Sequence, residues 1–384
     1  GAPVQTLENL EMKKTLVAIA ALASVSAFAQ SSVTIDGYFD RGAIVTNNTN
    51  SAKSAKGVGS NAGTTTIGVK GVTDLGGGLK AGFSVNTDFA DLGGVTQDSN
   101  TIAQAGTFAN SQSYAELVSA SFGTLRLGSP NNDTLTNATS VASPAFSTGV
   151  GSAYSSSWSI SNGMGTGVTG SGGIVSLTAL GADKGGARGI RQANTVKYIS
   201  PSFNGFNVAY SAAAQNEQGT AGTGHTVGVT EAAARYTNGP LDVMYTALEY
   251  KVGSVAPTIG GLAAGTSSKH NLLGASYQVL PTLKLHAGFG TSKASATTIA
   301  NSSSSQYGVT YNVTPMIDVL AQVAKVDDKN TTAYDRKMTG LGVDYKFSKT
   351  TRAYLRYDSL NLNTAAASSG SEIKRTAIGL SQAF

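Results

Sequence analysis

Apolar residues alternate with small or polar residues along most of this chain after its first thirty positions. In 79–86 (LKAGFSVN) the apolar side chains occupy the odd positions, and 283–290, 307–313 and 341–347 repeat the pattern. A period of two is that of an extended strand with one apolar face and one polar face. Segments of about ten residues with this pattern are typical of transmembrane β-strands.

The pattern predicts sixteen strands, and an even number allows an antiparallel sheet to close into a barrel. Tight turns alternate along the chain with long Ser/Gly/Asn-rich connections at 47–63, 253–268, 293–303 and 363–371. We therefore predict an all-β fold, a transmembrane antiparallel β-barrel of 16 strands. Its expected strands are 32–46, 64–72, 79–88, 113–121, 123–128, 191–200, 206–213, 225–237, 241–252, 269–279, 282–292, 304–313, 316–326, 335–347, 351–362 and 373–384.

Two soluble β-architectures are alternatives. A β-sandwich of this length would need several domains joined by linkers, and the sequence shows no linker. A β-helix would show a short internal repeat, and none is found. Both alternatives are less consistent with the pattern than the barrel.

The first thirty residues predict export. Met12, Lys13 and Lys14 form a positive start, residues 16–25 form an apolar stretch, and Ala27-Phe28-Ala29 is a small-x-small cleavage site. These are the parts of a secretory signal peptide, here 12–29, and the apolar stretch is too short to span a membrane. Residues 1–11 are interpreted as an upstream segment without structural meaning, and 30–384 as the barrel.

Composition narrows the function classes. Charged residues are 13% of the chain, against roughly 25% in soluble domains. Cysteine is absent, which excludes disulfides, thiolate metal sites and cysteine nucleophiles. The net charge of +5 is spread along the chain, and no dense Lys/Arg cluster predicts binding to nucleic acid.

Several motifs bring the sequence close to one family. SSVTIDGYFD (31–40), GVTDLGGGLKAGF (71–83), FGTLRLG (122–128), YISPSFNGF (198–206) and a final strand ending on Phe384 stand in the chain. Together they resemble Gram-negative general-diffusion porins of the β-proteobacterial type. The resemblance implies an outer-membrane homotrimer, with the long third loop folded into the lumen, that transports small hydrophilic solutes passively and without a cofactor.

The longest stretch without a predicted strand is the expected constriction loop, about 129–190, of which roughly 130–158 would enter the barrel. Asn131, Asn132, Asp133 and Thr134 are its candidate site residues, and Asp133 is the one acidic residue between Gly128 and Ala182. Relatives commonly carry more acids on this loop. We therefore expect a weaker transverse field here than in those relatives.

Strand parity assigns basic side chains to the inner wall. A charge on the lipid face costs about 2–4 kcal/mol near the midplane, so parity is a strong filter. Arg126 and Lys70 also match positions that are basic in the family, whereas Thr66 and Asn86 stand where relatives carry charged residues. The basic residues expected on the wall are Arg126, Lys70, Arg352, Arg356, Arg375, Lys284 and Lys80, with Lys346 also inward.

Acidic residues share the inner face. They are Asp36, Asp40, Asp88, Glu116, Asp242, Asp318 and Asp344. Glu231 is ambiguous, and Arg41 falls on the outward parity, where a bulge or snorkelling would account for it. The balance favours a mild anion preference, with a non-selective or a cation-preferring channel as alternatives.

Other functions are less well supported. The three histidines, His225, His270 and His286, form no catalytic constellation with a serine and no metal-ligand spacing. A Ca²⁺ site at Asp327-Asp328 is an alternative to a solvated loop. An adhesin barrel with long working loops would leave the third loop outside the lumen. Tyr307, Tyr311, Tyr345 and Tyr357 are interpreted as an interface girdle, and outer-membrane lipid and lipopolysaccharide as expected partners.

Overall fold

The computed structural model describes residues 31–49, 54–89, 108–153, 191, 194–213, 227–252, 265, 267–294, 302–329, 335–363 and 372–384. The predicted upstream segment, the predicted signal peptide and all of 154–190 lie outside these residues, as does His225. The described part of the chain contains no helix that is long and apolar enough to cross a membrane.

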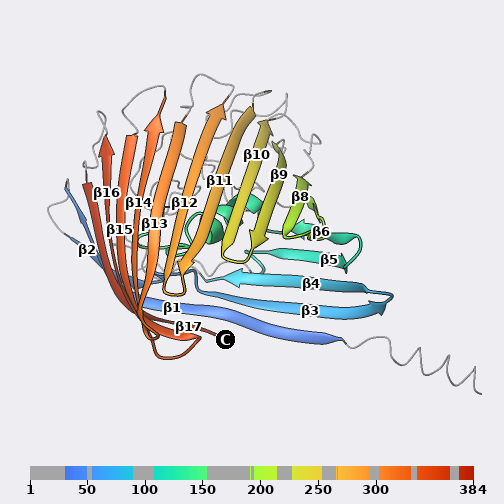
Figure 1. Cartoon of the computed structure of the whole chain (residues 1–384), viewed down its shortest axis with the longest axis horizontal. Helices are drawn as coiled ribbons and strands as arrows, with labels where there is room; N and C mark the ends of the chain where they lie inside the picture. Colours follow the sequence, from blue (N-terminus) through green and yellow to red (C-terminus); the bar gives the residue numbers. More distant parts are fainter. Residues whose placement is uncertain are drawn as a thin grey trace, which may run out of the picture.

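The strands form one antiparallel sheet (Figure 1). They are β1 (Ser32–Asn48), β2 (Ala55–Gly59), β3 (Thr66–Gly76), β4 (Leu79–Asp88), β5 (Ser113–Ser119), β6 (Gly123–Ser129), β7 (Thr195–Ile199), β8 (Phe206–Ala213), β9 (Val227–Asn238), β10 (Leu241–Val252), β11 (Ser267–Leu280), β12 (Leu283–Ala294), β13 (Ser302–Thr314), β14 (Ile317–Asp328), β15 (Asp335–Lys346), β16 (Thr351–Asn363) and β17 (Glu372–Ala383). Two short helical turns, α2 (Asp133–Thr136) and η1 (Asn137–Val141), follow β6.

The sheet closes through β1. One edge of β1 pairs with β17, and the other pairs with β2 at Gly42–Thr46 and with β3 at Ser32–Tyr38. β2 and β3 thus share one place in the barrel, interrupted at 60–65, so the seventeen segments fill sixteen positions. The expected 16-strand closed barrel is confirmed.

Two details of the predicted strand list are wrong. The connection 47–63 contains β2, because five of its residues continue the pairing with β1. The strand expected at 191–200 begins at Thr195, and Arg191 instead forms an isolated bridge with Asn131. In both places the segment is short and polar, so its residue pattern does not show where the strand begins.

The two faces of the wall differ as parity predicts. Large apolar side chains on alternate positions, such as Phe83, Leu127 and Leu355, remain 43–50% exposed. The opposite face, called the inner face below, holds buried polar and charged side chains, among them Glu231, Gln322 and Asp358. A sheet with an apolar outside and a polar inside is the arrangement of a barrel in lipid.

Candidate functional site

The segment that follows β6 is tied at its start to the inner face. Glu231 on β9 accepts hydrogen bonds from the backbone N–H groups of Asp133 and Thr134, each at 2.6 Å. The ammonium of Lys197 on β7 lies 2.8 Å from the Asp133 carboxylate. The one acidic group of the segment's described part is therefore paired with a lysine of the wall. Glu231, ambiguous in sequence, is inward and buried.

The middle of the segment bonds to four consecutive strands. The Asn137 side-chain amide donates to the backbone oxygens of Met244 and Leu272, on β10 and β11, at 3.0 Å each. The Ala142 carbonyl accepts from Gln306 on β13 at 2.5 Å and lies 2.8 Å from Nδ1 of His286 on β12. A short helical segment is thus fixed across the inner wall.

The far end reaches the opposite part of the wall. Ser143 Oγ donates to Gln322 on β14 at 2.7 Å, and the Gly151 N–H donates to Asp358 on β16 at 2.8 Å. The Val150 N–H donates to the Asn61 carbonyl in the break between β2 and β3, also at 2.8 Å. Residues 131–153, called the crossing segment below, therefore touch the inner face from β7 round to β2.

Glycines of the wall make room for this segment. A Cβ on Gly274 would collide with Asn137 Oδ1, one on Gly288 would lie 2.8 Å from the Ala142 Cβ, and one on Gly340 would lie 2.6 Å from the Gly151 oxygen. Three strands thus lack a side chain where the segment comes closest.

Among these three wall glycines, Gly340 comes closest to the backbone of the crossing segment, so a side chain added there should displace the segment. We expect Gly340→Ala to destabilise the barrel by about 1–3 kcal/mol, as overpacking does, and to change single-channel conductance, because Gly151 must shift. The control is Gly82→Ala, whose Cβ would meet Gly71 and Glu116 but not the segment. Equal conductance changes in both variants would contradict the role of Gly340.

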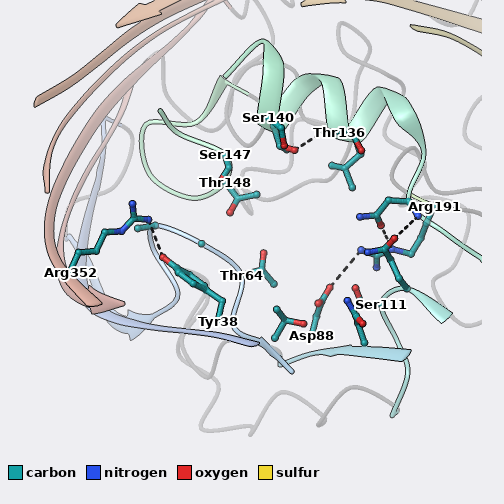
Figure 2. A pocket seen from close by; sticks show the side chains of 18 residues that line it. Tyr38, Thr64, Asp88, Ser111, Thr136, Ser140, Ser147, Thr148, Arg191 and Arg352 are labelled. Carbon is teal, nitrogen blue, oxygen red and sulfur yellow. Dashed lines mark hydrogen bonds and ion pairs between the residues drawn. The ribbon is translucent and has the colours of Figure 1, made fainter. Parts of the chain in front are cut away.

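A cavity of about 440 Å³ separates the crossing segment from the wall (Figure 2). The segment lines it with hydroxyl groups of Thr136, Thr139, Ser140, Ser147 and Thr148. The wall contributes Tyr38, Ala62, Gly63, Thr64, Thr66, Asn86, Asp88, Ser111 and Gln112. The lining is mostly uncharged but rich in hydrogen-bonding groups.

Two guanidinium groups lie on opposite sides of this cavity, Arg352 on one and Arg191 on the other (Figure 2). Arg352 donates to the Tyr38 hydroxyl at 3.1 Å and pairs with Asp344 at 3.1 Å. Arg191 lies 3.7 Å from Asp88 and donates to Asn131 at 3.1 Å. Among the charged groups that line the cavity, two are positive and one, Asp88, is negative, so one positive charge is in excess.

The seven basic residues expected on the wall all lie on the inner parity, but Arg352 alone of the seven lines the cavity. Arg126 pairs with Glu116 at 2.9 Å, and Lys70 pairs with Asp36. Arg356 pairs with Asp344 and Arg375 with Asp358, each at 2.5 Å and largely buried. Lys284 and Lys80 complete the set, on β12 and β4 near short turns.

The four candidate residues of the expected constriction loop also differ in whether they line the cavity. Asn131 lines the cavity. Asn132 and Thr134 are buried, and Asp133 is held against Lys197. The hydroxyl groups that do face the cavity follow them, from Thr136 onward. The hydroxyl groups expected to line this loop are therefore present, but on residues that follow Thr134 in the sequence.

Sequence reasoning missed Arg191 and Lys197. Val196 and Tyr198 are exposed on the outer face, so the odd positions of this strand point inward. This alternation is visible in the sequence and would have placed the Lys197 side chain on the inner wall. Arg191 lies beyond the strand, and parity gives no information there.

Arg41 keeps its outward parity. Its guanidinium lies 5.0 Å from the Phe39 ring centre and donates to Ser60 at 3.0 Å and Thr65 at 2.9 Å. It therefore ties β1 to the break between β2 and β3, and neither a bulge nor the cavity is involved.

His270, His286 and Asp327, which the sequence analysis considered for catalysis or metal binding, each contact neighbouring groups of the barrel or the crossing segment. His270 is buried, 2.9 Å from Ser292 Oγ and edge-on to Tyr250, whereas His286 contacts the crossing segment. Asp327 pairs with Lys325 at 2.6 Å. Among the described residues no three His, Asp or Glu side chains are grouped to hold a metal ion.

Comparisons with known proteins agree with this architecture. Residues 15–365 match the family model described as Gram-negative porin. Outer membrane porin protein 32 of Delftia acidovorans is 34% identical over 272 residues, a match that spans 69% of this chain and 66% of the relative, just under two thirds of its length.

Solved structures are similar over nearly the whole chain. The anion-selective porin from Comamonas acidovorans has a TM-score of 0.71 at 27% identity, covering 92% of this chain and 100% of that one. In-vitro folded OmpT of Vibrio cholerae, in its trimer form, has a TM-score of 0.60 at 14% identity, covering 92% and 99%. The second likeness concerns the fold alone.

Proposed function

The chain belongs to the Gram-negative porin family of outer-membrane β-barrels, and from that premise we propose that it forms a water-filled channel for passive diffusion of small hydrophilic solutes and ions. The family consists of channels and not enzymes. A 16-stranded barrel is wide enough for an aqueous path. Transport of this kind needs no cofactor, and we propose a homotrimer as the assembled form.

We propose that the crossing segment narrows this path and that the 440 Å³ cavity is part of the constriction. The observation that carries this is the row of hydrogen bonds from Glu231 to Asp358, which hold the segment against the inner face. A loop fixed at so many points sets a size limit, because solutes must pass beside it. Its hydroxyl groups replace part of a solute's hydration shell.

The channel should prefer anions mildly. Arg191 and Arg352 face a cavity with one carboxylate, and Asp133 is neutralised by Lys197 away from it. Rings of charge at a narrowing select ions by sign. An excess of one positive charge supports a mild preference, and the similar Comamonas structure is of an anion-selective porin. We propose Arg352 and Arg191 as the selecting residues, with Arg126, Lys70, Arg356, Arg375, Lys284 and Lys80 shaping the wall.

Arg352→Gln tests this assignment. It leaves Arg191 and Asp88 as balanced charges on the cavity, so the anion preference of the wild type should fall to almost none. The measurement is the reversal potential across a planar bilayer in a KCl gradient. Arg126→Gln is the control, since Arg126 pairs with Glu116 outside the cavity. A cation-selective wild type, or a shift with the control alone, would refute the proposal.

A further inference from the structure

Two inward arginines of β16 share one carboxylate but differ in how far they extend from it. Asp344 on β15 lies 3.1 Å from Arg352 and 2.5 Å from Arg356. The Arg356 side chain is 2% exposed, whereas the Arg352 side chain is 35% exposed and lines the cavity. Because the two arginines share this acid, a contact other than Asp344 is needed to explain why Arg352 stays open to the cavity.

Three acceptors hold the Arg352 guanidinium, one for each of its nitrogens. Nε donates to Ser381 Oγ, Nη1 to Asp344 and Nη2 to the Tyr38 hydroxyl, each at 3.1 Å. Asp344 and Ser381 lie on β15 and β17, the strands that flank β16, whereas Tyr38 lies on β1, one strand beyond β17. The contact with Tyr38, drawn in Figure 2, therefore holds the guanidinium on the side away from Asp344.

Tyr38 is itself fixed by the break between β2 and β3. Its ring lies against the backbone of Gly63, where an added Cβ would collide with it. The N–H groups of Ala62 and Gly63 donate to the Asp40 carboxylate at 2.7 and 3.0 Å. Asp40 is fully buried and accepts from the Tyr354 hydroxyl at 2.6 Å. The position of the Tyr38 hydroxyl is thus set by a buried network beneath its ring.

The hydroxyl of Tyr38 is a neutral acceptor, so it orients Arg352 without cancelling its charge. A carboxylate at this place would pair with the guanidinium, as Glu116 pairs with Arg126. With no acceptor there, the guanidinium would turn towards Asp344, because arginine and carboxylate favour two parallel hydrogen bonds and Arg352 donates only one to Asp344 here. Either change would remove the positive excess from the cavity.

We propose that Tyr38 is a positioning residue for ion selectivity, whose uncharged hydroxyl holds the positive charge of Arg352 in the cavity. This inference rests on the proposed function, in which Arg352 is a selecting residue. It adds that selectivity depends on the direction of a guanidinium as well as on the number of charges at the cavity. A substitution that changes no charge should therefore change the selectivity.

Tyr38→Phe tests the proposal, because it removes the hydroxyl and keeps the ring against Gly63. In a planar bilayer with a KCl gradient, its reversal potential should move most of the way from the wild-type value to that of Arg352→Gln. Added to Arg352→Gln, it should have no further effect, since residues that act as one unit are not additive. Tyr114→Phe is the matched control: the Tyr114 ring lies 4.7 Å from the guanidinium carbon of Arg126, outside the cavity, and its loss of a hydroxyl should leave the potential at the wild-type value.

A crystal structure of Tyr38→Phe tests the positioning apart from the selectivity. We expect Arg352 to donate two hydrogen bonds to Asp344, and an unchanged guanidinium would overturn the proposal. Heat-modifiable mobility on gels shows that each variant is folded. A wild-type potential in Tyr38→Phe beside a shifted one in Arg352→Gln, or an equal shift in Tyr114→Phe, would also overturn it. An unchanged potential in Arg352→Gln would instead refute the selecting role of Arg352, and with it any effect of Tyr38 on selectivity.

Discussion

Asp358→Ala should destabilise the barrel by about 3–5 kcal/mol, the cost of removing one partner from a buried ion pair. Asp358 is fully buried, and its two carboxylate oxygens accept from Arg375 at 3.0 and 2.5 Å. It also accepts the Gly151 N–H at 2.8 Å. The substitution leaves the largely buried Arg375 without this carboxylate and removes the hydrogen bond that joins Gly151 of the crossing segment to β16. The free energy of unfolding in urea, in lipid vesicles, measures the effect.

Asp36→Ala provides the comparison for Asp358→Ala. Asp36 also pairs with a basic residue on the inner face, Lys70, but both side chains are more than a third exposed. Exposed pairs contribute about 0–1 kcal/mol, so this variant should remain close to wild type in stability. If the two variants lost equal stability, burial of the Asp358–Arg375 pair would not be the cause.

The barrel could be predicted because the alternation within each strand is visible in that strand's own residues. One lipid-facing and one inner face impose a period of two, and a charge on the wrong face is costly. Arg126, Arg352 and Arg375 could therefore be assigned to the inner face from their apolar neighbours alone. The break between β2 and β3 was not predicted, because this reasoning depends on an alternating pattern. Its residues 60–65 follow no alternation, because Ala62 and Gly63 turn inward to Asp40 and Asn61 meets the crossing segment.

The site was less predictable because it depends on contacts between distant parts of the chain. Asp133 and Lys197 are 64 residues apart, and Thr134 and Glu231 are 97 apart. Parity says which way a side chain points but not what it meets. Parity therefore assigned these basic residues to the wall but could not show which of them line the cavity, since that depends on pairing with acids of neighbouring strands, as in Arg126–Glu116 and Arg375–Asp358.

Glu231→Ala should loosen the start of the crossing segment. The two N–H groups of Asp133 and Thr134 would lose their acceptor, and each such group left unsatisfied costs about 1–3 kcal/mol, so a loss of about 2–6 kcal/mol is expected. The segment would remain attached through the Asp133–Lys197 ion pair, Asn137 and Ala142. We therefore expect a folded barrel whose single-channel current is larger and noisier than that of wild type.

Glu116→Gln separates this effect from the mere loss of an inward carboxylate. Glu116 faces inward on β5 and pairs with Arg126, not with the crossing segment. Its removal changes the wall charge as Glu231→Ala does but leaves both N–H groups satisfied, so current noise should stay at the wild-type level. Glu231→Gln should lie between the two, because an amide oxygen can accept one N–H while its NH₂ group faces the other. Increased noise in Glu116→Gln, or a quiet channel in Glu231→Ala, would mean that Glu231 acts through charge and does not anchor the segment.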